Sequence, residues 1–507
     1  APDLTTNDKS KQASSGGPIT QDNTSVEYYC TIFTATESSV EKDLLWTGSD
    51  DGLIHVSKDG GANWSNVTPK DCPKWMMWNA IEVDPFKKGA AYIVGTRYKL
   101  DDFTPYIYKT EDYGQTWKLI TSGISSNHFT RVVRADQKRA GLLYAGTEYG
   151  MYISYNDGAS WQSFQLNLPM VPITDLTIKN NDLIVATQGR AFWVIDDLTQ
   201  IQQMDPAIKS KSLHVYNANP AYRIPPVVSR WGGSVSTPAN VGMNPSKGAV
   251  INFYAANVTD SSTASVAVYD AKGKLISRTT TQSKTNPLKL TKGNNQFVWD
   301  MQYPATDKID DLILWTGAPG SITAIPGNYK AVVRVDKDSL DVPFTLMADP
   351  NYKCSQADYE AQLDFLLKVQ GKFNETMKAI KDIRQARSQI QDFVSKQGSN
   401  CPKELKQLSE DLSKQLTAIE EKLHQTKAKS GQDVLNFPIR LDDKLGGVFD
   451  MAASGNMAPS KGALEVYASL SAQVDEQITK LKGVLSSGLA SFNKMITEKG
   501  LPVVVVK

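Results

Sequence analysis

One motif occurs three times in the first two hundred residues, and it constrains the fold more than any other feature of the sequence. The motif has Ser or Thr first, Asp or Asn two residues later, then Gly and finally Trp, and its copies start at Ser57, Thr110 and Ser154. Successive copies start 53 and 44 residues apart. This spacing is typical of the four-stranded blades of a β-propeller.

Each copy follows a unit of two β-rich stretches around a polar turn. The units begin at Leu44, Ala90, Leu142 and Asp182, and the fourth unit carries no copy of the motif. Four blades do not close a ring, and an open arc leaves sheet faces exposed. We therefore expect an upstream fragment of the same precursor, or another chain, to complete the propeller. The opening "PDLTTND" is typical of the outer edge of a blade whose inner strands lie elsewhere.

The motif is known as the Asp box, or bacterial neuraminidase repeat, and its residue types suit a hairpin turn. Ser, Thr and Asp side chains accept backbone N–H bonds, Gly adopts positive φ, and Trp packs back between sheets. Asn can make the same local bonds as Asp. We interpret the boxes as structural rather than catalytic. Their main residues are Asp59, Gly61, Trp64, Asp112, Gly114, Trp117, Asn156, Gly158 and Trp161.

After about residue 206 the pattern changes twice. Spaced strands with Gly, Pro and Asn turns over 206–350 predict an immunoglobulin-like β-sandwich. From Ser355 onward, apolar residues recur at helical spacing in three stripes, over 366–394, 405–423 and 464–496, with a short helix expected near 441–449. The predicted division is therefore 1–205 for four units of a propeller, 206–350 for the sandwich and 351–507 for a helical bundle.

Composition excludes several classes of protein. The chain has 55 basic and 54 acidic side chains, so no excess positive charge attracts nucleic acid. No apolar run is long enough to span a bilayer. The four His residues are scattered and no phosphate-binding Gly-rich loop occurs, so we predict no metal and no cofactor. The first residues look processed, and we expect a secreted, periplasmic or outer-surface protein.

The cysteines form two pairs that are local in sequence, Cys30 with Cys72 and Cys354 with Cys401. In an oxidising compartment each pair could close a loop. The alternative is four buried free thiols. The second bridge further requires that the chain return along the first long helix before Cys401.

Several stretches together resemble a known family. They are "DDFTPYIYKTEDYGQTW", "GLLYAGTEYGMYIS", "DLIVATQGRAFWVIDDL" and "NFPIRLDDKLGGV". The chain is similar over nearly its whole length to the C-terminal half of large secreted sortilin-like, Asp-box propeller proteins of Bacteroidetes, which are often labelled glycosyl hydrolases. The resemblance implies further blades at the N-terminal side. The family's last blade usually has His where this chain has Gln188.

Candidate site residues are numerous. Asp50, Asp51, Asp101, Asp102 and Glu148 are acids in blade turns, and Arg97, Arg131, Arg134 and Arg190 could clamp an anion. We interpret the acids as turn residues that bind backbone donors. For ligand binding we single out Arg190 near the propeller funnel, with Trp75 and Trp78 as stacking planes. The alternative is structural: Arg190 would lock the last blade to its neighbour, and the tryptophans would fill the core. No catalytic residue is assigned.

The sequence favours an extracellular or cell-surface binding and assembly protein whose propeller holds a peptide, glycan or partner protein. The alternative is a glycoside hydrolase of the two-propeller or sialidase type, with an active site shared with the missing blades; a pair of carboxylates in the funnel would favour it. A third hypothesis is an interaction module that docks on a cell-surface protein complex through its helices.

Overall fold

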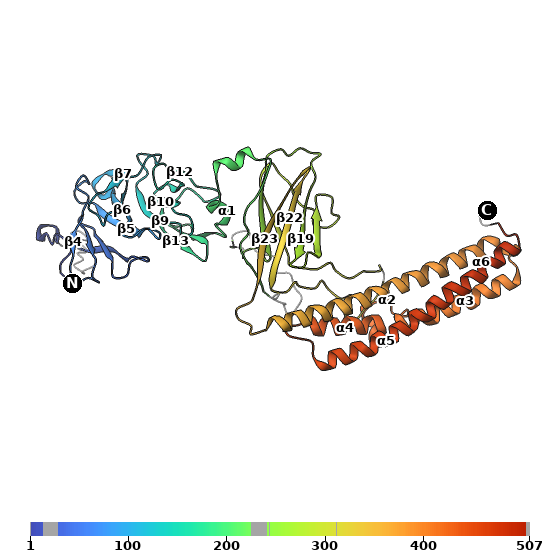
Figure 1. The fold of residues 1–507 in the computed structure, drawn as a ribbon. Helices are drawn as coiled ribbons and strands as arrows, with labels where there is room; N and C mark the ends of the chain where they lie inside the picture. The colour runs from blue at the N-terminus through green and yellow to red at the C-terminus, as the bar shows by residue number, and fades with distance from the viewer. Residues whose placement is uncertain (1, 14–28, 225–240, 243, 311, 503–507) are drawn as a thin grey trace, which may run out of the picture. The chain divides into compact units, whose positions relative to one another are not determined.

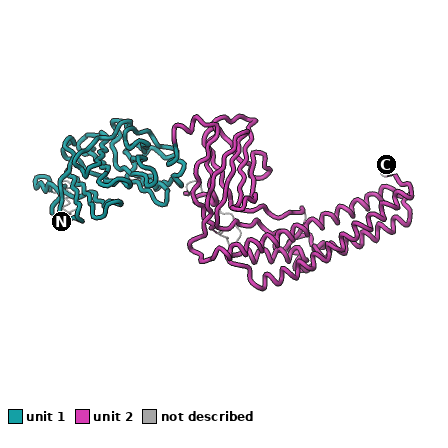
Figure 2. Tube along the Cα trace, viewed as in Figure 1, with its two compact units in different colours: residues 1–204 teal, residues 205–507 magenta. Residues whose placement is uncertain are grey.

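The computed structural model describes residues 2–13, 29–224, 241–242, 244–310 and 312–502. The chain forms two compact units, Ala1–Met204 and Asp205–Lys507 (Figure 2). The first unit is built from β-sheets. The second contains a β-sandwich and the long helices (Figure 1).

The first unit consists of four antiparallel sheets that follow one another along the chain. We call them blades 1 to 4. Their strands are β1 (Ile32–Glu37), β2 (Leu45–Ser49), β3 (Ile54–Ser57), β4 (Ser65–Asn66); β5 (Met77–Val83), β6 (Ala91–Arg97), β7 (Asp102–Thr110), β8 (Lys118–Leu119); β9 (Thr130–Ala135), β10 (Leu143–Thr147), β11 (Gly150–Ser154), β12 (Gln162–Ser163); and β13 (Ile173–Lys179), β14 (Asp182–Thr187), β15 (Phe192–Ile195). The predicted partial propeller is therefore confirmed.

The blades pack face to face in sequence order, and small residues make the close packing possible. A Cβ added to Gly48 on β2 would lie 2.8 Å from Cβ of Trp78 on β5, and one on Gly146 of β10 would lie 2.7 Å from Cγ2 of Ile173 on β13. Trp46, Trp78 and Ile93 lie in the core between the first two blades, while the core of the later blades contains Tyr144 and Ile173. The apolar β-strand segments of the sequence thus form the buried interfaces between blades.

The two ends of this unit differ from the middle. Blade 4 has three strands within the described residues, and the chain continues into the short helix α1 (Thr199–Gln202). Residues 2–13 contain one 3-10 turn, Lys9–Lys11, and no strand. Thr6 donates from its backbone and its hydroxyl to Asp51 Oδ2, both at 2.7 Å, and so fastens this segment to the β2–β3 turn.

The second unit begins with a two-sheet sandwich. One sheet has the order β16-β18-β21 and the other β17-β23-β22-β19-β20. The strands are β16 (Leu213–Val215), β17 (Ala221–Arg223), β18 (Ala249–Ala255), β19 (Ala264–Asp270), β20 (Leu275–Thr280), β21 (Gly293–Trp299), β22 (Gly327–Val335) and β23 (Asp338–Ala348). Phe253, Trp299 and Phe344 lie in the core. The short strands β16 and β17, of which β17 pairs in parallel with β23, were not predicted.

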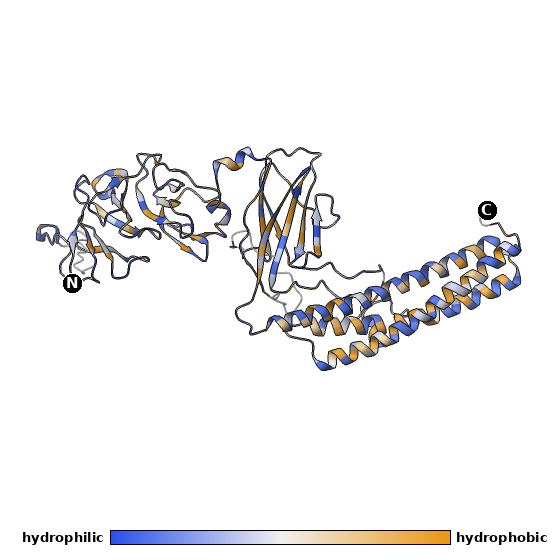
Figure 3. Ribbon diagram, in the orientation of Figure 1, coloured by the Kyte–Doolittle hydropathy of each residue, from blue (hydrophilic) through white to orange (hydrophobic). Residues whose placement is uncertain are grey.

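The helical part follows the predicted stripes, and Figure 3 shows apolar and polar residues alternating along its helices. The helices are α2 (Gln356–Gln397), α3 (Lys403–Leu423), α4 (Leu441–Ala453), α5 (Lys461–Gly483) and α6 (Leu489–Glu498). Ser355 and Asp358 form a capping box at the start of α2. The third predicted stripe is divided into α5 and α6 by a π-helical turn, Val484–Gly488.

Sandwich and helices share one continuous apolar cluster, which explains why they form one compact unit. The boundary between them at residue 350 stays a prediction.

The Cys354–Cys401 bridge is excluded by the length of α2. Cys354 precedes this helix and Cys401 follows it, and 42 helical residues span about 60 Å at 1.5 Å per residue. The chain does not return along the helix before Cys401, as the bridge required. All four cysteines, Cys30 and Cys72 included, are free thiols in the structure.

Candidate functional site

The inner strands of all four blades line one cavity of about 470 Å³. β1 contributes Thr34 and Thr36, β5 contributes Asn79 and Glu82, β9 contributes Arg131 and Arg134, and β13 contributes Thr174 and Asp175. Because the first strand of each blade faces the propeller axis, this cavity is the central funnel of the arc. We refer to it as the funnel cavity.

Arg134 joins two carboxylates across the funnel cavity. Its Nη2 lies 2.7 Å from Asp175 Oδ1 on β13, and its Nη1 lies 3.7 Å from Glu82 Oε2 on β5. Nε of Arg134 also donates to the carbonyl of Leu176 at 2.6 Å. One guanidinium from blade 3 thereby connects blades 2, 3 and 4.

Glu82 is the most strongly perturbed acid of this group. Burial raises the pKa of its carboxyl to about 7, while Arg134 and the backbone N–H of Ala135 oppose the shift. The side chain is 22% exposed. Near pH 7 the Glu82 carboxyl is therefore partly protonated, whereas an ordinary glutamate is fully ionised.

Arg131, near the start of β9, also lines the funnel cavity, and it supports an aromatic surface. Its Nε and Nη2 both lie 2.7 Å from Glu148 Oε2. Its guanidinium lies 5.7 Å from the ring centre of Tyr98 and 5.1 Å from that of Phe129. Tyr98 stacks on Phe129 at 5.2 Å, and Phe103, which is 47% exposed, contacts Phe129 at 6.0 Å. We call Tyr98, Phe103 and Phe129 the aromatic shelf.

The three residues predicted to bind a ligand do not line the funnel cavity. Arg190 is exposed in the β14–β15 turn and donates to its neighbour, the carbonyl of Gly189. Trp78 is fully buried between blades 1 and 2, so its ring is not available to a ligand; this corrects its assignment as a stacking plane. Trp75 is half-buried, 6.1 Å from Tyr29 and beneath Lys11.

The turn acids bind backbone and neighbouring side chains. Asp50 accepts a bond from Thr31 N at 2.8 Å. Asp51 binds Thr6, as described above. Asp102 accepts from Arg97 Nη1 at 2.6 Å and from the Tyr106 hydroxyl at 2.8 Å, and Asp101 has the left-handed φ of 57°. The backbone contacts of Asp50 and Asp51 are the turn chemistry that the sequence suggested, whereas Asp102 also pairs with Arg97 and Glu148 pairs with Arg131.

The three Asp boxes share the same set of hydrogen bonds. The first hydroxyl accepts from the Gly backbone at 2.8 Å in the first box, 2.9 Å in the second and 3.0 Å in the third. The same hydroxyl donates to Asp59, Asp112 or Asn156, whose oxygen in turn accepts an N–H four residues later. Asn156 thus makes the backbone contact that the two aspartates make.

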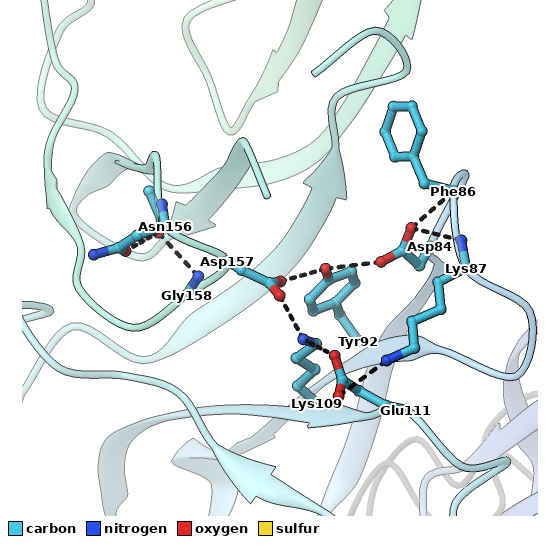
Figure 4. A network of polar contacts seen from close by, with 10 residues as sticks. Asp84, Phe86, Lys87, Tyr92, Lys109, Glu111, Asn156, Asp157 and Gly158 are labelled. Carbon is cyan, nitrogen blue, oxygen red and sulfur yellow. Dashed lines mark hydrogen bonds and ion pairs between the residues drawn. The ribbon is translucent and has the colours of Figure 1, made fainter. Parts of the chain in front are cut away.

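The third box also ties blade 3 to blade 2 through a polar network (Figure 4). Asp157 Oδ1 accepts from the hydroxyl of Tyr92 at 2.6 Å, and its Oδ2 pairs with Lys109. Burial and the bond to Asp157 raise the pKa of Tyr92. Lys109 and Lys87 both pair with Glu111, so charges alternate along the blade surface.

The tryptophans of the second and third boxes bind the preceding blade. Nε1 of Trp117 donates to Val67 O at 2.6 Å, and Nε1 of Trp161 donates to Ile120 O, also at 2.6 Å. Both carbonyls belong to the residue directly after the outermost strand of the blade before. In the first box, Trp64 donates instead to Gly61 O in its own turn, at 3.0 Å.

Sequence reasoning missed Glu82 and Asp175 and did not recognise Phe129 as the centre of an aromatic surface. The available signal was position: all three lie on or directly before the first strand of a blade, which faces the funnel. The candidate acids of the sequence analysis lie instead in the turns after the second strands.

The fold and boxes define the first unit as part of an Asp-box β-propeller. The family model "Sortilin-Vps10: Sortilin, neurotensin receptor 3" matches residues 52–190. Over these residues the chain is similar to the sortilin-type propeller family. No curated protein matches it.

Solved propeller structures show distant similarity. YCF48 from Cyanidioschyzon merolae is 17% identical, with 32% of this chain and 52% of that chain covered and a TM-score of 0.27. YCF48 bound to D1 peptide is 18% identical, with 32% and 55% covered and a TM-score of 0.25. The GH74 xyloglucanase from Xanthomonas campestris is 13% identical, with 62% and 54% covered and a TM-score of 0.27. The chain spans about half the length of these three structures.

None of the helices in the described part of the chain combines the length and apolar character that a bilayer crossing needs.

Proposed function

We propose that this protein is an extracellular or cell-surface binding and assembly protein whose propeller funnel holds a peptide, glycan or partner protein. The observation that carries the proposal is the funnel cavity, which four inner strands line with polar side chains beside the aromatic shelf, whose Phe103 is exposed. Ligand sites of this kind combine a few convergent polar groups with apolar contact area.

The charges in the funnel favour recognition. Arg131 and Arg134 each have a carboxylate at 2.7 Å, so the cavity offers paired groups that can also bind the amides or hydroxyls of a ligand. Asp175 is 63% exposed and is accessible to a ligand. Phe103 and Tyr98 provide flat faces for aromatic side chains or sugar rings.

Binding should depend on Arg131. We expect the double substitution Arg131→Met with Glu148→Gln to weaken ligand binding about tenfold or more, because it removes the charged edge of the aromatic shelf without leaving either partner unpaired. Binding to a panel of immobilised peptides and oligosaccharides measures this. Arg190→Met is the matched control, since Arg190 is exposed outside the cavity and should bind like the wild type. Equal loss in both variants, or none in the double variant, would contradict the proposal.

A second candidate is a glycoside hydrolase, and one observation favours it. Glu82, with a pKa of about 7, and Asp175 lie on the same guanidinium, and hydrolysis requires a proton donor with a carboxylate. Under this alternative, Glu82→Gln would abolish release of reducing sugar from a polysaccharide. We favour binding because each of these carboxylates is engaged by Arg134.

We propose further that blade 1 accepts another four-stranded blade, supplied by an upstream fragment of the same precursor. The support is the first box: Gly114 and Gly158 are buried against Val67 and Ile120 of the blade before, whereas Gly61 is half-buried and Trp64 turns to its own loop. The occupant would supply a carbonyl and an aliphatic side chain after its fourth strand. Blade 4 of a second copy of this chain does not fit this role, because it has no fourth strand among its described residues.

Peptide mass mapping of the purified protein tests whether this upstream fragment is present. We expect peptides from a precursor segment upstream of Ala1 to co-purify, and Trp64→Ala to reduce their amount, because the indole would donate to the added blade. Substitution of the exposed Trp315 on the second unit should not change the amount. If the purified wild-type protein contains no upstream peptide, the proposal fails.

A further inference from the structure

A second cavity lies in the other compact unit, between the sandwich and the helices. It has a volume of about 390 Å³. Arg223 at the end of β17, Lys247, Asp300 and Asn456 line it together with the apolar parts of Ile224 and Tyr352. This cavity is separate from the funnel and plays no part in the function proposed above.

Arg223 is a buried cation without an acidic partner among the described residues. It is 6% exposed. Its Nη1 donates to the Asn456 side-chain oxygen and its Nη2 to Gln362 Oε1 at 3.2 Å, and its guanidinium lies 4.9 Å from the ring centre of Tyr359. Both hydrogen-bond partners are neutral amides, so nothing in this network balances the charge.

Two donors of the residues that line this cavity are also unused. Nε of Arg223 and Nδ2 of Asn456 are buried and have no hydrogen-bond partner in the described structure. Both can donate. Two unused donors on neighbouring side chains are uncommon, because buried polar groups are nearly always hydrogen-bonded in native proteins.

An uncompensated buried charge is costly, since no ion pair offsets the desolvation of the guanidinium. An incoming anion would supply the missing charge and accept the unused bonds. A planar or tetrahedral oxyanion suits the fork of a guanidinium, and charge-assisted bonds of this kind are the stronger ones. Lys247 adds a second positive charge at the cavity wall.

We propose that this cavity is a binding site for the oxyanion group, carboxylate or phosphate, of a small organic ligand, with Arg223 as the counter-charge. The cavity is larger than a bare oxyanion, and Ile224 and Tyr352 offer apolar surface to the rest of the ligand. Asp300, which also lines the cavity, disfavours a second negative charge on the ligand.

The full chain is titrated with sodium acetate and sodium phosphate at constant pH and ionic strength, with chloride as the reference salt, by calorimetry and by thermal unfolding. We expect at least one of the two anions to bind with millimolar or tighter affinity and to raise the unfolding midpoint above that in chloride. The anion that binds more tightly identifies the oxyanion class. In Arg223→Met the affinity should fall at least tenfold.

Two further variants keep the test decisive. Arg278→Met removes an exposed arginine from β20 of the same unit and should bind like the wild type. Asn456→Leu removes the unused Nδ2 donor together with the side-chain oxygen that holds Arg223 Nη1 in place, so it should weaken binding several-fold. This variant decides the question if Arg223→Met does not fold. Binding that is absent from the wild type, or unchanged in Asn456→Leu and any folded Arg223→Met, would overturn the site and leave Arg223 as a structural residue stacked on Tyr359.

Discussion

The substitution Trp161→Ala is expected to destabilise the propeller unit by about 3–5 kcal/mol, the usual cost of truncating a buried tryptophan. Trp161 is 5% exposed, and its indole N–H donates to Ile120 O in the preceding blade. Alanine at this position leaves a cavity between blades and an unpaired carbonyl. Equilibrium urea unfolding of the full chain measures the loss of stability. Hydrogen exchange of the β10 and β11 amides shows whether the loss lies in blade 3.

Trp64→Ala is the matched control, because it changes the same residue of the same motif in blade 1. In the chain freed of the upstream fragment, Trp64 is half-buried and donates within its own turn, so we expect a smaller cost, about 1–2 kcal/mol. Equal losses in the two variants would show that the box stabilises its own turn alone and does not lock one blade to the next.

The second large effect is a pH dependence that originates in Glu82. Burial raises its pKa in the folded protein to about 7, from 4.5 for an unperturbed glutamate. The folded state therefore binds more protons than the unfolded state between these values, so stability falls as pH rises from about 4.5 to 7. The full loss is about 3 kcal/mol above pH 7, at about 1.4 kcal/mol per unit of pKa shift.

Glu82→Gln removes this loss, because an amide stays neutral and still accepts the bond from Ala135 N. Urea unfolding at pH 5, 6, 7 and 8 should show the variant close to the wild type at pH 5 and more stable by up to about 3 kcal/mol at pH 8. The difference between the two proteins cancels the other titrating groups. A constant difference across this range would show that Glu82 is ionised throughout.

The fold could be predicted because its signals are local. The boxes fix hairpin turns through side-chain bonds within four residues, and the stripes of α2 and α3 follow helical spacing. β16 and β17 were missed because three residues carry no recognisable alternation. α2 is unbroken because nothing in its sequence stops it before Gly398, which rules out the bridge between Cys354 and Cys401.

The site was harder to predict because it depends on contacts far apart in sequence. Arg134 and Asp175 are 41 residues apart, and only the packing of blade 4 on blade 3 brings them together. Tryptophan is a residue type that often binds ligands, but Trp78 is buried in the core. It can pack there because Gly48 has no side chain to occupy the same space. Arg223 could not be singled out from the sequence, because its lack of an acidic partner is known only from its neighbours in the fold.

The most direct test of the binding account is to recover the funnel ligand after prolonged incubation with the protein and to determine its mass. A peptide or oligosaccharide that binds the wild type, but not the Arg131→Met/Glu148→Gln variant, is incubated with an excess of the full chain at pH 6 and 7. The account predicts that the ligand returns intact. Cleaved ligand from the wild type, and intact ligand from Glu82→Gln, would contradict it and establish a hydrolase.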